Sequence, residues 1–383
     1  MGAPHIIVIG AGSTGAAIAH DLALRGLRVT VVERGGVASG TTGHNQAQLH
    51  SGARYAVNDP ESARECIEEN MLLRKIMPEG LELNDGLFVA LTEEHLAYRP
   101  VFLEACAQCR IPAREIPAGR ALELEPRLNP RILAAIQIPD GVFDPYRFCL
   151  SFLATAHHNG ARIRTFAEVS GIDAGQCAVH LRDRRSGKTE TLGADLIVNA
   201  AGPWAARVAA MAGMRVQVEP SAGAMITVGM RLCHRVINLL APPGDGDIIV
   251  PQRQTSILGT TSWTVNDPDD IAIPPGHVEQ IFRVAERLIP DVRRAPVRGV
   301  MAAARPLLVV PGASGRTTTR GFACFDHARD GADGLISIVG GKTTTARSMA
   351  EKLSDMVCAK LDMKAECRTR TEQLLSYRVG IGA

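Results

Sequence analysis

One segment near the N-terminus, residues 5–34, constrains the fold more than any other part of the chain. It opens with the apolar run Ile6 to Ile9, which is too short for a helix and rich in β-branched residues, as buried parallel strands are. Gly10, Gly12 and Gly15 follow in the spacing G-x-G-x-x-G, and after them the apolar periodicity becomes helical. The segment therefore predicts a strand, a glycine turn and a helix.

The residues after this helix complete a dinucleotide-binding unit. Gly26 ends the helix, and Val29 to Val32 form a second strand that stops at Glu33. In such a unit the first glycine permits the tight turn, the second lets the backbone approach a pyrophosphate, and the third lets helix and strand pack closely. Glu33 stands where a carboxylate accepts the ribose hydroxyls of an adenosine. Because all these parts are in register, they predict a bound dinucleotide and not a ligand-free glycine turn.

The composition is that of a globular protein with two domains. The chain has 383 residues, and its 42 basic and 40 acidic residues leave a net charge of +2, which predicts no nucleic-acid partner. The nine cysteines are scattered as in a reduced cytosolic protein. Cys106 and Cys109 form a C-x-x-C on an expected helix face, and we expect no metal site. Without a basic leader or an apolar run of about 18 residues, we expect a cytoplasmic protein with no membrane span.

Residues 35–57 form a segment of small and hydroxyl-bearing residues that cannot build a core. Its stretch Ser39 to Thr42 suits the start of a helix whose amides point at phosphate. Polar side chains then follow in the same segment: His44, His50, Arg54 and Tyr55. The alternative interpretation is an ordinary glycine-rich surface loop.

The remaining periodicity predicts alternating helices and strands. Residues 61–75 read as a charged helix with a solvated face, and 163–172, 177–181 and 189–192 as three antiparallel strands. Further helices are expected around 100–109, 148–158 and 277–288, and further strands at 86–91, 135–138, 225–228, 248–251, 256–260 and 299–308. Two more buried strands, 195–199 and 335–339, each lead to glycines that open a helix.

The chain thus has three strand-to-glycine-to-helix joints, at residues 10–15, 201–204 and 340–345. In an open parallel sheet the carboxyl ends of the strands line one ligand crevice. Three joints and an intervening antiparallel sheet favour a large flavin dinucleotide over a nicotinamide. The fold class we predict is α/β, a Rossmann-type FAD-binding domain with an inserted, mainly antiparallel substrate-binding sheet.

Several motifs carry a resemblance to a known family. They are VIGAGSTGAAIAHDLALRGLRVTVVER, LHSGARYAV, ESARECIEEN, VNAAGPW, ILGTTS, ARPL and IVGGKTTTAR. In this order, from about residue 5 to about residue 360, they resemble the FAD-dependent glycerol-3-phosphate dehydrogenases, the catalytic subunit of the anaerobic enzyme in particular. The organisation we expect is a discontinuous FAD-binding domain (1–84, 144–219 and 322–361), a substrate-binding domain (85–143 and 220–321) and a polar surface tail (362–383).

The resemblance implies FAD, held without a covalent bond. His44 occupies the place of a histidine that bonds flavin covalently in some related amine dehydrogenases, so a covalent link through His44 is the alternative. The implied cofactor residues are Gly10, Gly12, Ser13, Thr14, Gly15, Glu33, Arg34, Ser39, Thr41, Thr42, His44, Asn45, Val169, Ala201, Gly202, Trp204, Gly340, Gly341, Lys342, Thr343 and Thr344.

The resemblance also implies a substrate site for a small anionic secondary alcohol, glycerol 3-phosphate, which would be oxidised to dihydroxyacetone phosphate. Arg54, Tyr55, Arg305 and Lys342 would bind it, because guanidinium groups suit phosphate and carboxylate oxygens. His50 would remove the hydroxyl proton while hydride passes to flavin N5, with Arg305 and Lys342 stabilising the alkoxide. The alternative role for His50 is a hydrogen bond to the flavin.

Three positions depart from the family's pattern: Ala222, Ala224 and Ala346. They imply a roomier or less polar pocket. The stretch GHNQAQLH is also similar to L-2-hydroxyglutarate dehydrogenases, so a 2-hydroxy acid, or an amino or imino acid, is the second substrate class. A non-catalytic electron-relay subunit is a third possibility.

The family's cysteine-rich C-terminal region is not found in this sequence. Electrons are therefore expected to pass to quinone or to an iron–sulfur partner protein. Peripheral association with the cytoplasmic side of the inner membrane would be compatible with a quinone acceptor.

Overall fold

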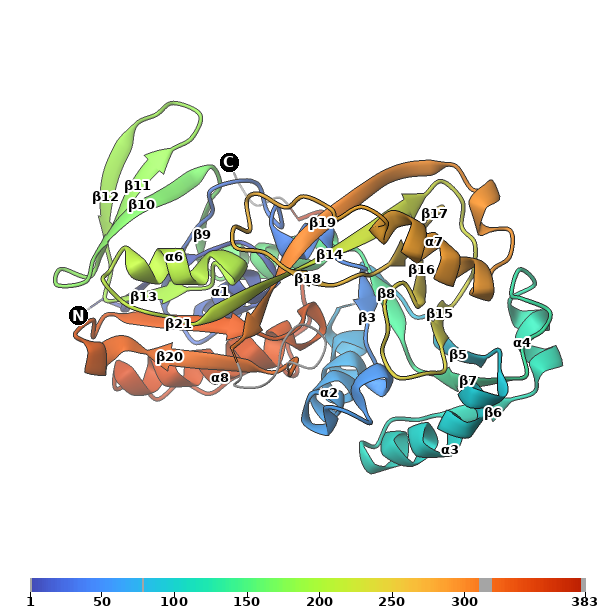
Figure 1. Ribbon diagram of the computed structural model, residues 1–383. Coiled ribbons are helices and arrows are strands. Elements are labelled where there is room, and N and C mark those ends of the chain that lie inside the picture. The colour runs from blue at the N-terminus through green and yellow to red at the C-terminus, as the bar shows by residue number, and fades with distance from the viewer. Residues whose placement is uncertain (1, 78, 310–318, 380–383) are drawn as a thin grey trace.

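A six-stranded sheet forms one half of the molecule (Figure 1). The structure is a computed structural model that describes residues 2–77, 79–309 and 319–379. Parts of two predicted segments, residues 310–318 and 380–383, lie outside the described residues. In spatial order the strands are β20 (Phe322–Asp326), β21 (Leu335–Gly340), β13 (Leu196–Asn199), β1 (His5–Ile9), β2 (Arg28–Val32) and β9 (Arg162–Arg164). All neighbouring strands are parallel except β20 and β21, so the predicted Rossmann-type sheet is confirmed.

Both faces of this sheet are covered, which explains why β1 is apolar at every position after His5. Ile6 and Val8 pack in one core with the helices α1 (Ser13–Leu24), α5 (Pro145–His158) and α8 (Ala346–Lys360). Ile7 and Ile9 pack in a second core on the opposite face. Successive side chains of a strand point to opposite faces, so a strand between two layers needs an unbroken apolar run. The second layer holds α6 (Ala205–Ala210) and the antiparallel strands β10 (Ala167–Asp173), β11 (Ala178–Asp183) and β12 (Thr189–Gly193).

The prediction of a single strand over 163–172 is wrong. The chain makes two strands there, because Phe166 takes a left-handed φ of 58° and turns the backbone between them. The first, β9, joins the parallel sheet beside β2, and only the second belongs to the antiparallel layer.

A nine-stranded, mainly antiparallel sheet forms the other half. It takes strands from both predicted substrate-binding segments. The order is β18 (Trp263–Thr264), β14 (Val218–Val228), β17 (Thr255–Gly259), β16 (Ile248–Gln252), β15 (Val236–Leu239), β5 (Gly86–Ala90), β7 (Ala134–Ile138) and β6 (Arg114–Ile116), with β19 (Val297–Leu308) also paired to β14. The helix α7 (His277–Leu288) packs on this sheet, while α3 (Glu93–Gln108) and α4 (Ala118–Leu124) lie near β5, β6 and β7 (Figure 1). Strand β15 was not predicted from the sequence.

A small sheet and one helix join the two halves. The sheet consists of β3 (Gln48–Leu49), β8 (Gly141–Phe143) and β4 (Leu81–Glu82), and the helix is α2 (Pro60–Ile76). The predicted solvated face of α2 is only partly correct. Its Glu69 is buried and accepts two hydrogen bonds from the buried Arg347 of α8, at 2.6 and 2.9 Å. A buried carboxylate needs such a partner, and this one lies 278 residues away in the chain.

The segment after α8 is not the surface appendage that its polar composition predicts. Leu374 is buried, and its N–H donates to the carbonyl of Ile76 at 2.8 Å. Arg368 donates to the carbonyl of Leu24, and Thr369 accepts from Arg347. A few buried residues among many polar ones are enough to fix this segment to the half that contains the six-stranded sheet. The domain boundaries themselves stay a prediction.

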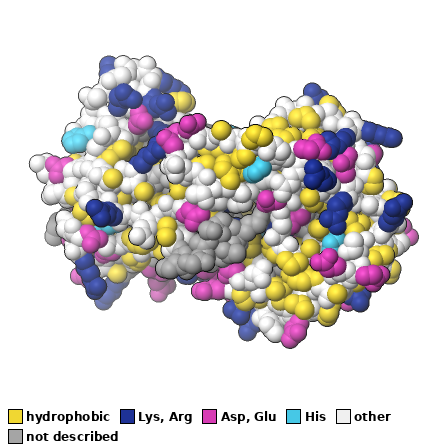
Figure 2. All heavy atoms as spheres, in the orientation of Figure 1, with side chains coloured by type: hydrophobic (Ala, Val, Ile, Leu, Met, Phe, Trp, Pro, Cys, Tyr) yellow, Lys and Arg dark blue, Asp and Glu magenta, His cyan; other side chains and the backbone are white. Residues whose placement is uncertain are grey.

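The distribution of charged side chains and the positions of two cysteines can be compared with what the composition predicts. On the face drawn in Figure 2, positive and negative side chains are interspersed. Cys106 on α3 and Cys109, the residue that follows this helix, are both buried. Within the described ranges, no helix is long and apolar enough to cross a membrane, and no group of three or more potential metal ligands is present.

We expect one histidine of the core, His20, to destabilise the fold in acid. His20 of α1 is fully buried against Phe152, and neither of its ring nitrogens has a hydrogen-bond partner among the described residues. Burial, reinforced by the nearby Arg347 charge, lowers the pKa of His20 to about 3. The unfolded chain takes up this proton near pH 6.5, so stability is lost as the pH falls from about 6.5 towards 3.

The unfolding free energy should fall between pH 7 and pH 4.5 in both proteins. We expect this fall to be about 2–3 kcal/mol smaller in His20→Leu than in wild type. Urea unfolding at the two pH values measures this difference. His158→Leu, at an exposed histidine at the end of α5, is the control. An equal loss in His20→Leu and wild type would contradict the prediction.

Candidate cofactor and substrate site

A cavity of about 1050 Å³ lies where the two halves meet. This is the upper end of the range for ligand pockets. Its walls come from the carboxyl ends of β1, β13 and β21, from the segment after β2, and from β14 and β19 of the other half. Every predicted cofactor and substrate residue lines this cavity except Gly15. The three glycine joints therefore converge on one site, as expected for parallel strands.

The first joint forms the cradle that a pyrophosphate needs. Gly12 precedes the first turn of α1 and lines the cavity, and the N–H of Ser13 donates to the hydroxyl of Thr42 at 3.1 Å. A Cβ on Gly12 would have only Thr42 within 4 Å, so the glycine leaves the helix N-terminus open to an anion. Gly10 has a left-handed φ of 109°. Gly15 acts by packing alone, because a Cβ there would lie 1.9 Å from the carbonyl oxygen of Gly10.

Glu33 lies beside this cradle, at the end of β2. Its two carboxylate oxygens accept from the N–H groups of Ala11 at 2.9 Å and Gly35 at 2.7 Å. These bonds fix the carboxylate in the cavity wall, where its remaining lone pairs suit ribose hydroxyls. The fit of an adenosine diphosphate group to this end is therefore good.

Two residues that line the cavity, Arg207 and Asp269, were not predicted from the sequence. The guanidinium of Arg34 lies 4.2 Å from the ring centre of Trp204, and it pairs with Asp269 at 2.7 Å. Arg207 of α6 pairs with the same carboxylate at 2.8 Å. Asp269 comes from the loop between β18 and α7, in the other half of the molecule, so no local pattern indicates it.

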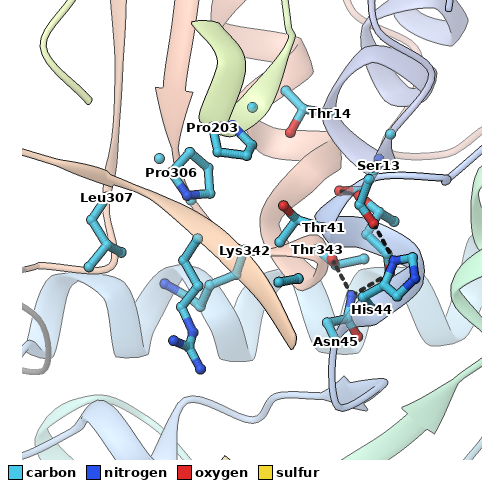
Figure 3. A pocket seen from close by; sticks show the side chains of 18 of the residues that line it. Ser13, Thr14, Thr41, His44, Asn45, Pro203, Pro306, Leu307, Lys342 and Thr343 are labelled. Carbon is cyan, nitrogen blue, oxygen red and sulfur yellow. Dashed lines mark hydrogen bonds between the residues drawn. The ribbon is translucent and has the colours of Figure 1, made fainter. Parts of the chain in front are cut away.

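The third joint binds the loop that follows β2. Gly340 and Gly341 both have left-handed φ values, 93° and 76°, which few other residues adopt. The side-chain amide of Asn45 donates to the Thr343 hydroxyl at 3.4 Å, and the two lie together in Figure 3. The N–H of His50 donates to the Thr344 hydroxyl at 3.2 Å. Residues of the glycine-rich segment are thus held at the cavity wall, and the surface-loop interpretation is wrong. The predicted helix start at Ser39–Thr42 is one 3₁₀ turn, Thr41–His44.

His44 lies in this turn and lines the cavity. Its Nδ1 is 2.9 Å from the carbonyl oxygen of Gly40, which leaves Nε2 as the nitrogen available to a ligand. We expect no covalent bond to flavin, since the family resemblance implies a non-covalent cofactor. Acid precipitation of the yellow protein should leave the flavin in the supernatant, and flavin in the pellet that disappears in His44→Ala would contradict this.

A cluster of polar groups lies further along the cavity. The rings of His50 and Tyr55 have their centres 5.4 Å apart, and Nζ of Lys342 lies 5.1 Å from the Tyr55 ring centre. Lys342 also donates to the carbonyl of Arg320 at 2.9 Å. Burial, with the positive charges of Lys342, Arg54 and Arg320, lowers the pKa of His50 to about 3. His50 is therefore neutral at physiological pH.

The two predicted anion-binding arginines have different surroundings. Arg54 pairs with Asp247 at 2.7 Å, both side chains are nearly fully buried, and Nη1 of Arg54 has no partner among the described residues. Arg305 donates to the backbone carbonyls of Ser221 and Ala222 and to the Thr260 hydroxyl. Asp247 was missed, although its loop, PPGDGD, has the glycine and aspartate content of a tight turn.

The three departures from the family's pattern do not shape the cavity. Ala222 and Ala224 are fully buried in β14, and Ala346 is buried at the start of α8. None of them lines the cavity, whereas Gly223 between the first two does. Side chains alternate along a strand, so the expected enlargement of the pocket by Ala222 and Ala224 is wrong.

Comparison with known proteins agrees with this site. Residues 5–347 match the family described as FAD dependent oxidoreductase. The chain is 43% identical to the A1 subunit of the anaerobic glycerol-3-phosphate dehydrogenase of Haloferax volcanii, over 97% of this chain and 66% of the relative. It is 42% identical to the corresponding subunit of the Escherichia coli K12 enzyme, over 95% of this chain and 68% of the relative. The chain thus spans about two thirds of the length of these relatives.

One solved structure shows the same fold. It is the glycerol-3-phosphate dehydrogenase of Bacillus halodurans complexed with FAD, with a TM-score of 0.75 and 24% identity, over 97% of this chain and 68% of that one.

Proposed function

We propose that this chain, which belongs to the family of FAD-dependent oxidoreductases, oxidises glycerol 3-phosphate to dihydroxyacetone phosphate. The observation that carries the proposal is the cluster in the cavity where the neutral His50 lies near the positive charges of Lys342, Arg54 and Arg320. Arg305 lines the same cavity. Positive groups suit an anionic substrate, and a neutral imidazole suits a secondary alcohol that must lose its hydroxyl proton. The relatives named above belong to enzymes called glycerol-3-phosphate dehydrogenases, which supports the same substrate.

Bound FAD would supply the hydride acceptor for the substrate carbon. The residues of the chain would do the rest of the chemistry. His50 would take the hydroxyl proton, and Lys342 and Arg305 would stabilise the alkoxide as it forms. Tyr55, whose ring lies near both His50 and Lys342, would fill one side of the substrate's space and exclude water.

A substrate screen tests the proposal directly. The purified yellow protein is mixed anaerobically with glycerol 3-phosphate, L-2-hydroxyglutarate, small hydroxy acids and N-methyl or imino acids. We expect rapid bleaching of the flavin band by glycerol 3-phosphate. Rapid bleaching only by a 2-hydroxy acid or an imino acid would show that this compound, and not glycerol 3-phosphate, is the substrate. Bleaching by none of them would favour the electron-relay role.

We further propose that Arg54 and Arg305 bind the substrate's anionic group. Each truncation to alanine removes a charge-assisted contact of roughly 1.5–3 kcal/mol, so substrate affinity should fall about tenfold to a hundredfold with normal FAD content. Rapid anaerobic reduction across substrate concentration measures the affinity of Arg54→Ala and Arg305→Ala.

An exposed arginine outside the cavity, Arg120→Ala, is the control. Unchanged half-saturation in both cavity variants would contradict the anion-binding role. A slower reduction at saturating substrate alone would indicate that the arginine acts on the flavin's charge.

The electron acceptor is a proposal of the same kind. The relatives are named as parts of an anaerobic dehydrogenase with more than one type of chain, which supports transfer of electrons to a partner protein. We propose an iron–sulfur protein or quinone as the acceptor and a peripheral position on the cytoplasmic side of the inner membrane.

A further inference from the structure

A buried carboxylate lies directly behind the segment that carries His50. Asp140, between β7 and β8, is 2% exposed. Its Oδ1 accepts from the N–H of Ser51 at 2.7 Å, and its Oδ2 accepts from the side-chain amide of Gln48 at 2.7 Å. Asp140 is not a lining residue of the cavity. It therefore contacts Ser51, directly after His50, and Gln48, two residues before His50, without lining the ligand space itself.

The backbone of His50 is fixed by two neighbouring bonds. The N–H of His50 donates to the Thr344 hydroxyl, and the next N–H, that of Ser51, donates to Asp140. Gly52 then turns the chain with a left-handed φ of 91°, which leads to Arg54. These bonds fix the backbone position from which the imidazole extends.

A second set of contacts supports Asp140 itself. Arg74 of α2 donates to the backbone carbonyls of Pro139 and Asp140, at 2.8 and 3.1 Å. Asn70 of the same helix donates to the carbonyls of Leu49 and Pro139. These bonds join the turn that carries Asp140 to β3, the strand directly before His50.

The charged and titratable groups that face Asp140 come from several elements. Arg74 and Cys66 lie on α2, Cys106 on α3 and Arg54 after β3, and the backbone of Gly86 in β5 also lies close to Asp140. Burial raises the pKa of Asp140 to about 6, against the hydrogen bonds from Ser51 and Gln48 and the charge of Arg74. With this pKa, the carboxylate of Asp140 changes charge in mildly acidic solution.

We propose that Asp140 is a positioning residue, whose ionised carboxylate holds the His50 segment in the geometry for proton removal and releases it on protonation. The inference rests on the proposed function, in which His50 is the base. Protonation would put a hydrogen on one oxygen and weaken the bond from Ser51 or Gln48. We therefore expect the reaction rate to fall in mild acid as Asp140 becomes protonated. His50 does not cause this fall, because it stays neutral to a much lower pH.

The test compares Asp140→Asn with wild type in rapid anaerobic flavin reduction by saturating glycerol 3-phosphate, from pH 5 to pH 8. The phosphate of the substrate also titrates near pH 6, so the readout is the ratio of the two rates. We expect wild type to be about tenfold faster at pH 7.5 and about equal at pH 5, with normal FAD content in both.

The matched control is Glu125→Gln. Glu125 is also 2% exposed and accepts two backbone N–H groups, but these belong to His234 and Arg235, directly before β15, and not to the His50 segment. Its rate should equal that of wild type at every pH. A wild-type to Asp140→Asn ratio that stays constant with pH would overturn the inference.

Two further variants keep the inference testable. In a His50→Ala background, Asp140→Asn should change the rate by less than about twofold, because a residue that acts through His50 has nothing left to position. Gln48→Met keeps Asp140 but removes one bond to its charged form, so the midpoint of the acid limb should move to higher pH.

A full additional loss in the His50→Ala background, or an unmoved midpoint in Gln48→Met, would each overturn the role of Asp140 and leave His50 as the base. A wild-type rate in His50→Ala alone would instead overturn the proposed base, and the positioning role with it.

Discussion

In the His50→Ala variant, saturating glycerol 3-phosphate should reduce the flavin about 10²- to 10⁴-fold more slowly than in wild type, because a positioned general base contributes that much to a proton transfer. The low pKa of His50, about 3, keeps the imidazole neutral across the physiological range. Rapid-mixing absorbance of the flavin band under anaerobic conditions measures the rate.

A second substitution separates the two roles that His50 can have. Glutamine keeps a hydrogen-bond donor for the flavin but does not accept a proton at neutral pH. If His50 is the base, His50→Gln should be as slow as His50→Ala. If it only hydrogen-bonds the flavin, His50→Gln should stay near the wild-type rate and the base role is wrong. His180→Ala, at an exposed histidine of β11, controls for the loss of a histidine as such.

Gly12→Val should abolish retention of FAD, with occupancy more than about tenfold below wild type and activity lost in proportion. The backbone of Gly12 has φ −76° and ψ −176°, which valine adopts without strain, so the protein itself should fold. A side chain there would lie at the mouth of α1, in the space that the pyrophosphate needs against the helix N-terminus.

FAD content after gel filtration, from the ratio of flavin to protein absorbance, measures the effect. Gly36→Val is the matched control, because Gly36 has no atom within 4 Å of an added Cβ and does not line the cavity. A yellow Gly12→Val protein with full occupancy would show that the first joint does not hold the cofactor's phosphates.

The sequence alone determined the FAD-binding framework. The apolar runs of β1, β13 and β21, each leading to glycine, indicated three joints on one parallel sheet, and all three meet at the cavity. This succeeded because the signals are local: a glycine that takes a positive φ or makes a close contact, and a strand that is apolar on both faces, are properties of a few neighbouring residues. The position of Glu33 after β2 follows from the same local unit.

The contacts that decide the chemistry lie between residues far apart in the sequence. Arg54 is paired with Asp247, 193 residues away, and Ser51 with Asp140, 89 residues away. The carboxylates Asp140 and Asp247 stand in ordinary turn sequences, so nothing local distinguishes them from solvent-exposed turn residues.

Only the tertiary structure decided those partners, and it also decided that the polar segment around Leu374 is packed and that β9 joins the parallel sheet. The physical reason is that local spacing fixes backbone conformation, whereas burial and hydrogen-bond partners depend on which elements the whole fold brings together. His50 was found as a candidate base from its motif, but its low pKa comes from burial and from Lys342, Arg54 and Arg320, which only the folded chain places around it.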